Sequence, residues 1–270
     1  MSVPDPQAEA AAEIRARIDT SKPHSARFWN YFVGGKDNYE KDRELGNHIK
    51  GIHPGLVDVA RLSRQFLGRA VRHLATEQGI RQFLDIGTGL PTADNTHEVA
   101  QRAAPDSRIV YVDNDPLVLA HARALLTSTP EGATSYIDAD LYDPKAILKA
   151  ASATLDLSRP VALMILNTLG HVADYGQARD LVAELMAGLP SGSYLVISDS
   201  TATSTGMIAA SDAYNKSGAI PYHVRSVEEI GGFFDGLELV EPGVSQVTRW
   251  RPEAEDTTPV DAYGAVARKP

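Results

Sequence analysis

The fold of this chain is decided by one stretch, Gln82-Phe83-Leu84-Asp85-Ile86-Gly87-Thr88-Gly89-Leu90-Pro91. A short apolar run carries an acid and then breaks into two glycines that stand one residue apart. A second strand-like run, from Arg108 to Asp113, follows after a gap that fits one helix, and it also ends in an acid. This order predicts a β-α-β unit, in which the glycine turn admits a ligand against bare backbone and the second strand delivers a carboxylate to a ribose.

The residues around the glycines distinguish two classes of cofactor. A dinucleotide site needs a third glycine for close packing of the helix that binds the pyrophosphate, and Thr92 occupies that position here, after Pro91. Asp85, just before the glycines, would repel a pyrophosphate but would attract a cationic ligand. S-adenosylmethionine carries a sulfonium and an ammonium and has no phosphates. The stretch therefore favours S-adenosylmethionine over a nicotinamide dinucleotide.

Composition limits the remaining possibilities. The chain has 270 residues, enough for one large α/β domain with an appendage, and its 26 basic and 35 acidic residues give a net charge of −9. This acidic balance argues against a broad nucleic-acid or anionic-membrane surface. The absence of cysteine excludes disulfides and cysteine-ligated zinc, and the histidines show no metal-ligand spacing, so no metal is expected. No apolar stretch is long enough to span a bilayer and the start lacks a signal peptide, so we expect a soluble cytoplasmic protein.

The N-terminal part is expected to form a tail, a helical cap and a long helix. Residues 1–22 are assigned to a flexible tail with a helix over Pro6–Ile18, and residues 23–55 to the cap. In the cap, two helices would flank a tight turn at Gly34-Gly35. Residues 56–270 then form the main domain, which opens with a helix over Leu56–Glu77. Apolar residues at every fourth position form one stripe on this helix, and its arginines at 61, 64, 69 and 72 are expected to be solvated.

The rest of the chain alternates strands and helices. Strands are expected over Gln82–Ile86, Arg108–Val112, Ser135–Ile137, Val161–Leu166 and Ser193–Ser198. Helices are expected over Asn95–Ala103, Pro116–Leu126, Pro144–Ala151, Tyr175–Gly188 and Ser226–Phe234, with a mobile polar segment over Thr201–Ala213. Three late segments read as antiparallel edge strands: Leu237–Val240, Val244–Trp250 and Tyr263–Val266. This alternation predicts a doubly wound α/β fold with a mostly parallel, seven-stranded sheet.

Four motifs in this core resemble those of the class I S-adenosylmethionine-dependent methyltransferases, which have a Rossmann-like fold. They are Asp85-Ile86-Gly87-Thr88-Gly89, Val112-Asp113-Asn114-Asp115-Pro116, Asp138-Ala139-Asp140 and Met164–Val172. Ahead of them, Ala26–Tyr39 resembles the signature of a bacterial family called simply S-adenosyl methyltransferase, formerly a domain of unknown function. The resemblance covers nearly the whole chain after about residue 22. One departure is visible, because the family tends to have Asn before Arg where this chain has Ser63-Arg64.

The resemblance implies S-adenosylmethionine as the cofactor. Asp113 would accept hydrogen bonds from both ribose hydroxyls, unless it is a helix N-cap, a role for which Asp115 is the better candidate. Asp140 would face the adenine amino group, with Asp138 as its competitor, and Asp85 would hold the methionyl ammonium. The residues expected to contact the cofactor are Asp85, Gly87, Thr88, Gly89, Asp113, Asn114, Asp140, Leu141 and Asn167, with Arg27, Tyr31, Gly34 and Gly35 of the cap.

Two features of the sequence, His171 and the segment Arg27–Tyr39, can each be interpreted in two ways. His171 follows the fourth strand, at the carboxyl edge where open α/β sheets bind ligands. As a catalytic residue it would take a proton from the acceptor, but it is equally well read as a partly exposed histidine at the start of a helix. The segment Arg27–Tyr39 fits a lid that closes over the cofactor, and its aromatics also fit the core of a structural cap.

Methyl transfer is the implied activity, and the resemblance names no acceptor. We expect an S-adenosylmethionine-dependent methyltransferase that acts on a small-molecule acceptor, with S-adenosylhomocysteine as the product. Two other classes stay open: a protein that binds S-adenosylmethionine without transferring its methyl group, and a nicotinamide-dependent oxidoreductase on the same β-α-β plan. An ordered acceptor pocket beside the sulfonium would favour transfer over binding alone.

Overall fold

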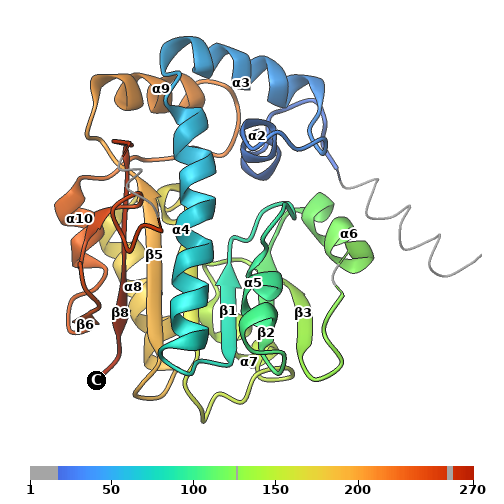
Figure 1. Cartoon of the computed structure of the whole chain (residues 1–270). Helices are drawn as coiled ribbons and strands as arrows, with labels where there is room; N and C mark the ends of the chain where they lie inside the picture. Colours follow the sequence, from blue (N-terminus) through green and yellow to red (C-terminus); the bar gives the residue numbers. More distant parts are fainter. Residues whose placement is uncertain (1–17, 126, 254–257) are drawn as a thin grey trace, which may run out of the picture.

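The computed structural model describes residues 18–125, 127–253 and 258–270, and a mixed sheet forms the centre of this part of the chain (Figure 1). The strand order is β3-β2-β1-β4-β5-β8-β6, and β7 pairs separately with β8. Strands β1 to β5 are parallel, and β8 is antiparallel to β5. The strands are β1 (Gln82–Ile86), β2 (Arg108–Asp113), β3 (Ala133–Asp138), β4 (Ala162–Leu166), β5 (Tyr194–Ser200), β6 (Glu238–Leu239), β7 (Ser245–Gln246) and β8 (Ala262–Arg268).

This architecture confirms the predicted doubly wound fold, with one difference in the strand count. The described residues form eight strands, one for each of the eight segments expected to be strands, whereas the sheet was expected to have seven. The expected strand Val244–Trp250 is correspondingly reduced to the two residues of β7. Trp250 turns into the core instead, where its ring packs edge-on against Phe66 at a centroid distance of 5.5 Å.

Helices cover both faces of the sheet because successive strand side chains point to opposite sides. Phe83 packs with α4 and α5 on one face, whereas Leu84 and Ile86 pack with α7, α8 and α10 on the other. Every helix predicted in this core is present, and a capping box of Ser226 and Glu229 begins α10. These helices are α4 (Leu56–Thr76), α5 (Thr96–Ala103), α6 (Pro116–Leu125), α7 (Pro144–Ala151), α8 (Tyr175–Ala187) and α10 (Val227–Gly232). A short 3-10 turn, η1 (Leu169–His171), follows β4.

Three helices form a cap over the end of the sheet at which the parallel strands terminate (Figure 1). Two of them, α2 (Ser25–Phe32) and α3 (Glu40–Ile52), flank the glycine turn as predicted. The third, α9 (Thr205–Asn215), occupies the segment expected to be mobile over Thr201–Ala213, so that prediction was wrong.

Helix α9 has sequence signals that the polar residues just before it, from Thr201 to Ser204, conceal. Ser204 Oγ accepts a hydrogen bond from the backbone N–H of Met207 at 3.1 Å and caps the helix. Met207, Ala210 and Tyr214 are buried, recur at helical spacing and share one core cluster with Ile49 of α3. The helix is therefore held by a narrow apolar stripe rather than by a uniformly apolar sequence.

Of the four arginines on the long helix α4, two are exposed to solvent and two are not. Its apolar stripe is buried as predicted, over Leu62, Phe66, Ala70 and Leu74. Arg61 and Arg72 are exposed, in agreement with the prediction. Arg69 is not free in solvent, because its Nε donates to the backbone oxygen of Trp250 at 2.9 Å. Arg64 also departs from the prediction, since it turns toward the strand ends and lines a cavity there.

Two predictions fall on residues that the structure does not describe. Apart from Ile18, the expected tail helix lies in residues 1–17, and residue 126, the expected end of α6, is also outside. In the described part of the chain, no helix is long and apolar enough to cross a membrane. The same part contains no group of three or more His, Asp or Glu side chains arranged to hold a metal ion.

Candidate functional site

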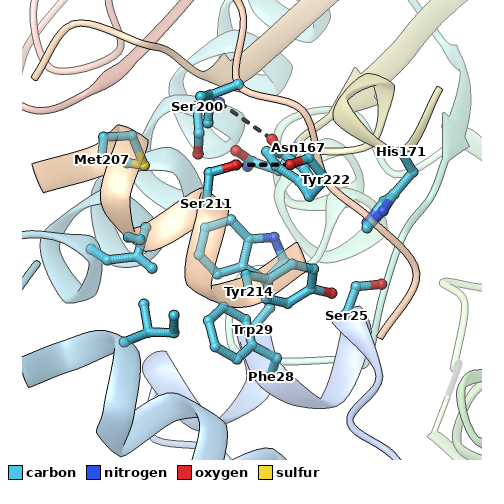
Figure 2. Close-up of a pocket in the computed structure, with 14 residues that line it drawn as sticks. Ser25, Phe28, Trp29, Asn167, His171, Ser200, Met207, Ser211, Tyr214 and Tyr222 are labelled. Atoms are coloured by element: carbon cyan, nitrogen blue, oxygen red, sulfur yellow. Dashed lines mark hydrogen bonds between the residues drawn. The ribbon is translucent and has the colours of Figure 1, made fainter. Parts of the chain in front are cut away.

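Two adjoining cavities lie between the cap and the carboxyl ends of β1 and β4. The first, called the glycine pocket, has a volume of about 650 Å³ and contains the turn after β1. The second, called the aromatic pocket, has a volume of about 490 Å³ and lies among α2, α9 and the end of β5 (Figure 2). Both volumes include the open space at the mouths of the cavities. Trp29 and Asn167 line both cavities, so the two meet at these side chains.

The turn after β1 depends on its two glycines for different reasons. Gly87 and Gly89 have φ angles of +70° and +66°, in the left-handed region that favours glycine. A Cβ on Gly87 would lie 2.1 Å from Oγ1 of Thr168, so glycine is needed there for close approach to the segment after β4. A Cβ on Gly89 would meet nothing within 4 Å, so this glycine presents bare backbone to open space. Thr88 lines the glycine pocket between them.

Asp113, at the end of β2, is held by backbone N–H groups. Its Oδ2 accepts from Gly89 at 2.8 Å and its Oδ1 accepts from Asp115 at 3.0 Å. Burial raises the pKa of Asp113, and these two hydrogen bonds oppose the rise. Because a carboxylate has about four acceptor sites, one on each oxygen remains for a ligand. Asp115 itself accepts from the N–H of Leu117 at 2.8 Å and caps α6, as predicted.

Asp85 is a buried acid in the wall of the glycine pocket. The residue is 4% exposed, and its Oδ2 accepts a hydrogen bond from Thr96 Oγ1 at 2.6 Å. Burial raises the pKa of Asp85 to about 6, against the opposing effects of that hydrogen bond and of Arg64. A buried carboxyl in a cavity wall provides a binding site for a cationic group.

Ser63 and Arg64 are pocket residues that the sequence analysis missed. The Arg64 guanidinium makes only long contacts, 3.4 Å from its Nη2 to Asn95 Oδ1 and to two backbone oxygens. Its Nε and the Oγ of Ser63 are buried and find no hydrogen-bond partner in the described chain. The sequence contained one signal for this placement. Ala60, Ser63 and Leu67 recur at helical spacing beside the apolar stripe of α4, and this spacing places small and polar groups toward the sheet.

Asn167, after β4, stands at the junction of the two cavities. Its φ angle is +52°, a backbone conformation that asparagine tolerates better than other residues with a side chain. The backbone N–H donates to the oxygen of Ser198 at 2.7 Å, which fixes the turn. The side-chain Oδ1 is buried and has no partner in the described chain. Strained backbone and an unpartnered polar atom at a cavity are typical of a functional residue.

His171 lies in the wall of the aromatic pocket, in the 3-10 turn η1. Its Nδ1 is 2.9 Å from the backbone oxygen of Pro221, and since a carbonyl oxygen only accepts, Nδ1 carries the hydrogen. Nε2 therefore keeps its lone pair in the neutral ring. Burial lowers the pKa of His171, which favours this neutral form at pH 7. The Tyr222 ring packs edge-on against the imidazole at a centroid distance of 5.1 Å.

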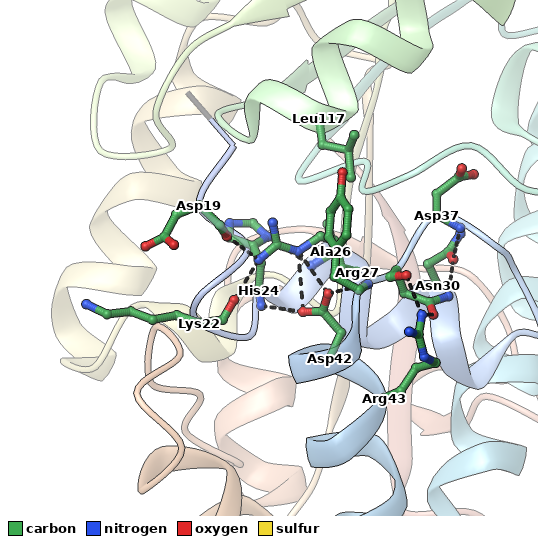
Figure 3. A network of polar contacts seen from close by, with 12 residues as sticks. Asp19, Lys22, His24, Ala26, Arg27, Asn30, Asp37, Asp42, Arg43 and Leu117 are labelled. Atoms are coloured by element: carbon green, nitrogen blue, oxygen red, sulfur yellow. Dashed lines mark hydrogen bonds and ion pairs between the residues drawn. The ribbon is translucent and has the colours of Figure 1, made fainter. Parts of the chain in front are cut away.

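The two cap side chains expected to contact the cofactor, Arg27 and Tyr31, bind other cap residues instead, and Figure 3 shows the contacts of Arg27. Arg27 is 3% exposed, and its Nε donates to Asp42 while its Nη2 donates to the backbone oxygens of Asp19 and Lys22. The Tyr31 hydroxyl donates to Asn47 Oδ1 at 2.7 Å. Both side chains thus make their contacts within the N-terminal segment rather than in a cavity.

The glycine turn of the cap also differs from expectation. Gly34 has a φ angle of +79° and provides the turn, and no neighbour lies within 4 Å of a Cβ built on it. A Cβ on Gly35 would lie 2.2 Å from the side chain of Asn30, so its close approach is to α2 and not to a ligand. The residues of α2 and the turn that line the glycine pocket are Ala26, Trp29, Asn30 and Val33. The helix was predicted correctly, but the face that lines the cavity is the one opposite Arg27 and Tyr31.

Three more expected residues lie beyond the glycine pocket, at the ends of β2 and β3. Asn114 and Asp140 are exposed and Leu141 is half-buried. Asp140 Oδ1 accepts a hydrogen bond from the N–H of Tyr142 at 3.0 Å. Asp138, its competitor, is the register partner of Asp113 and is also exposed. The choice between Asp138 and Asp140 therefore stays open.

One family model and two solved structures each match more than nine-tenths of the chain. A family model described as S-adenosyl methyltransferase matches residues 11–270. A crystal structure of a DUF574 family protein from Streptomyces avermitilis MA-4680 is 48% identical, with a TM-score of 0.91 over 94% of this chain and 100% of that one. The structure of a putative methyltransferase from Thermobifida fusca YX is 39% identical, with a TM-score of 0.84 over 93% and 96%.

A more distant similarity concerns the fold alone. An O-methyltransferase family protein from Burkholderia thailandensis is 14% identical, with a TM-score of 0.50 over 76% of this chain and 55% of that one. No curated protein matches the chain. The family model spans nearly all of the sequence, and the two similar structures agree with it over more than nine-tenths of this chain. The chain therefore belongs to the S-adenosyl methyltransferase family, and it is a methyltransferase that uses S-adenosylmethionine as its cofactor.

Proposed function

We propose that this methyltransferase acts on a small-molecule acceptor, which binds in the aromatic pocket while S-adenosylmethionine binds in the glycine pocket. The observation that carries the proposal is the shared wall, because Trp29 and Asn167 line both pockets. A methyl group held at this junction would face an acceptor on the other side. Both pockets are concave and lie beneath the cap, which favours a small acceptor over a macromolecular surface.

The glycine pocket fits the methionyl end of the cofactor. Asp85 would bind the ammonium, and Arg64 would bind the carboxylate through the Nε that lacks a partner. Ser63 Oγ adds a second donor next to Arg64. A buried polar atom without a partner costs about 1–3 kcal/mol, so the unpartnered atoms of Ser63, Arg64 and Asn167 around one cavity favour a polar ligand there.

The adenosine end would lie over the ends of β2 and β3. Asp113 keeps one acceptor site on each oxygen for the two ribose hydroxyls. Gly89 leaves open space for close approach to its backbone. Asn114 and Leu141 would flank the adenosine, and Asp140 or Asp138 would accept from the adenine amino group.

His171 is our candidate for the proton acceptor. When bound, the cofactor supplies an electrophilic methyl group, whose carbon–sulfur bond breaks with the electron pair left on sulfur. The acceptor atom forms the new bond to carbon and loses its proton. We assign this proton to Nε2 of His171, because Nδ1 already donates to Pro221 and burial favours the neutral ring. Trp29 and Asn167 would orient the two partners and exclude water.

The sequence left two alternative functions open: binding of S-adenosylmethionine without methyl transfer, and a nicotinamide-dependent oxidoreductase activity. An ordered cavity with a neutral histidine beside the glycine pocket favours methyl transfer over binding without transfer. Membership of the methyltransferase family sets the nicotinamide-dependent oxidoreductase aside.

We divide the chain into a tail, residues 1–22, a cap, residues 23–55, and a methyltransferase unit, residues 56–270, whose helix α9 completes the cap. Of the two interpretations of the cap, its internal hydrogen bonds favour a fixed roof over a mobile lid. Asn30 Oδ1, for example, accepts from the Asp37 N–H at 3.0 Å and from Asn38 Nδ2 at 2.9 Å. Proteolysis near Gly34 tests this choice, since a roof predicts the same cleavage rate with and without S-adenosylhomocysteine.

The position of the reactive methyl group provides the decisive test of the proposal. Protein bound to S-adenosylmethionine labelled with carbon-13 at the methyl group should show nuclear Overhauser contacts from that methyl to the Trp29 indole and the Asn167 side-chain amide. Trp250 is fully buried in the core and serves as the internal control, with no contact expected. A bound cofactor whose methyl group contacts neither Trp29 nor Asn167 would contradict the proposal.

A further inference from the structure

We propose that the acceptor is an uncharged aromatic molecule with a hydroxyl group, and that it binds in the aromatic pocket with this hydroxyl between Asn167 and His171. The inference rests on the proposed function and adds the chemical class of the substrate. Three properties of the pocket carry it: the shape and apolarity of its walls, the absence of charged side chains from them, and the kind of polar atom left without a partner.

Aromatic rings from separate elements form the walls of the pocket (Figure 2). Phe28 and Trp29 come from α2, Tyr214 from α9, and Tyr222 from the segment after it. The Phe28 and Tyr214 rings meet edge-on at a centroid distance of 5.2 Å, which fixes the orientation of both. Flat apolar walls of this kind favour a planar aromatic ligand, because ring–ring contacts add about 0.5–1.5 kcal/mol beyond the buried area.

Charged acceptors do not fit these walls. Among the described residues that line the aromatic pocket, none is Asp, Glu, Lys or Arg, and His171 favours its neutral form. Asp199 and Arg225 are buried and do not line the pocket, and the Tyr222 hydroxyl donates to Asp199. A carboxylate or an ammonium would thus lose its hydration without gaining an ionic partner, which costs several kcal/mol.

The unsatisfied polar atoms define what the acceptor must offer. Asn167 Oδ1 and the Tyr214 hydroxyl are buried without a partner in the described chain, and the lone pair on His171 Nε2 also accepts hydrogen bonds. The two acceptors, Asn167 Oδ1 and Nε2, select a ligand with a hydrogen-bond donor, and the Tyr214 hydroxyl can donate to a ligand oxygen. A neutral hydroxyl provides this donor, whereas an aliphatic amine would enter as a cation. In the transfer step, the oxygen–carbon bond forms as the carbon–sulfur bond breaks, and the hydroxyl proton passes to Nε2.

Three naphthalene derivatives with the same ring and different charge test the assignment. Titrations into protein saturated with S-adenosylhomocysteine should give a dissociation constant for 2-naphthol at least tenfold lower than for 2-naphthoate or 2-naphthylmethylammonium. With S-adenosylmethionine in place of the product, 2-naphthol should yield 2-methoxynaphthalene. Equal affinities, or tighter binding of either charged compound, would overturn the inference.

A matched pair of variants on α9 ties the binding to this pocket. Ala210 lines the aromatic pocket, whereas Ala209 is exposed on the same helix. Ala210→Phe should weaken 2-naphthol binding at least tenfold, and Ala209→Phe should not change it. Because Ala210 is tightly packed, Ser25→Trp at the partly exposed start of α2 provides a second way to obstruct the cavity. Unchanged 2-naphthol binding in folded Ala210→Phe or in Ser25→Trp would place the ligand elsewhere and overturn the inference.

The same titrations separate this inference from the proposed function. S-adenosylhomocysteine affinity should stay within twofold in all three variants, because none of the substituted residues lines the glycine pocket. Normal cofactor affinity without selectivity for 2-naphthol rejects the acceptor class but leaves the two-pocket proposal standing. A labelled methyl group that contacts neither Trp29 nor Asn167 rejects the two-pocket proposal, whatever the naphthalene compounds do.

Discussion

The Nε of Arg27 lies 3.1 Å from Oδ2 of Asp42, and this ion pair is buried between α2 and α3 (Figure 3). Arg27→Ala would leave the buried carboxylate with only its backbone donors from His24 and Tyr39. We expect the free energy of unfolding, measured in urea, to fall by about 3–5 kcal/mol. The exposed pair of Arg61 with Asp58 is the control, and Arg61→Ala should change it by less than about 1 kcal/mol.

The opposite result would restore the role that the sequence suggested for Arg27. If Arg27→Ala kept its stability but bound S-adenosylhomocysteine much more weakly, the side chain would contact the cofactor rather than join the two cap helices.

Arg64 is expected to bind the methionyl carboxylate. Arg64→Ala should raise the dissociation constant of S-adenosylhomocysteine roughly 10- to 100-fold, corresponding to the loss of a charged hydrogen-bonding partner worth about 1.5–3 kcal/mol. 5′-Methylthioadenosine lacks both the carboxylate and the ammonium, so its affinity should not change. Calorimetry with both ligands, and with Arg61→Ala as the control on the same helix, measures the difference. Equal weakening of both ligands would show that Arg64 acts on the whole pocket and not on the carboxylate.

The parallel strands and the glycine turn were predictable because local pattern determines them. The apolar runs, the acids at their ends and the positive-φ positions of Gly87 and Gly89 are all set within a few residues, and the structure places them as expected. Asp115 could likewise be identified as the N-cap of α6, since Pro116 follows it directly. The two short strands β6 and β7 were harder, because pairing with β8 and not their own sequence defines them.

The cap residues show where sequence reasoning stops. The helix of Arg27 and Tyr31 could be predicted, but its cavity-facing side depends on how α2 packs over β1 and β4, which is a tertiary property. Arg64 was assigned to solvent because arginines on a helix usually are solvated. Only the fold reveals that one turn of α4 passes over the strand ends and directs Ser63 and Arg64 into the glycine pocket. Helix α9 was missed because its polar residues outnumber the three that it buries.

Asp113 and Asp115 should separate cofactor binding from stability. Asp113→Ala is expected to weaken S-adenosylhomocysteine binding by about 1.5–3 kcal/mol, since it removes the acceptor for the ribose hydroxyls. Asp115→Ala removes the cap of α6 and should lower the free energy of unfolding by about 1 kcal/mol. Calorimetry and urea unfolding on both variants test the assignment. Exchanged phenotypes would mean that the two carboxylates have each other's roles.

Cofactor binding should depend on the ionisation of Asp85. Burial raises the pKa of Asp85 to about 6, so the free protein carries a neutral Asp85 below that pH and an anion above it. The cationic ammonium of S-adenosylhomocysteine binds the anion, and its affinity should therefore fall as the pH is lowered from 7.5 through 6 to 5. Asp85→Asn should bind more weakly at pH 7.5 and should lose most of this pH dependence. A variant that kept the full dependence would assign it to another group.

The raised pKa of Asp85 also affects the stability of the free protein. This effect has the opposite pH dependence to cofactor binding, because stability falls as the pH rises. Because the pKa of Asp85 is higher in the folded state than in the unfolded chain, the folded state binds more protons between about pH 4 and 6. Asp85 therefore contributes a loss of stability as the pH rises through this window, of the order of 3 kcal/mol. Urea unfolding of Asp85→Asn and of the unchanged protein at pH 4.5 and 7 measures most of this contribution, about 2 kcal/mol. The free energy of unfolding of the unchanged protein, relative to that of the variant, should be lower at pH 7 than at pH 4.5. A relative stability that is higher at pH 7 would reverse the sign of the predicted shift.

His171 should affect turnover and leave cofactor binding unchanged. With an acceptor that is turned over, His171→Gln should lower kcat by about 10²–10⁴-fold, the usual contribution of a positioned base, while the affinity for S-adenosylhomocysteine stays the same. Burial lowers the pKa of His171, so kcat of the unchanged enzyme should fall only at acidic pH, as the ring becomes protonated. In His171→Gln this fall of kcat at acidic pH should disappear. Because Asp85 also gains a proton at acidic pH, kcat has to be measured with saturating S-adenosylmethionine at each pH. An unaltered kcat and pH profile in His171→Gln would make His171 a wall residue of the aromatic pocket and would leave proton removal to solvent or to the acceptor itself.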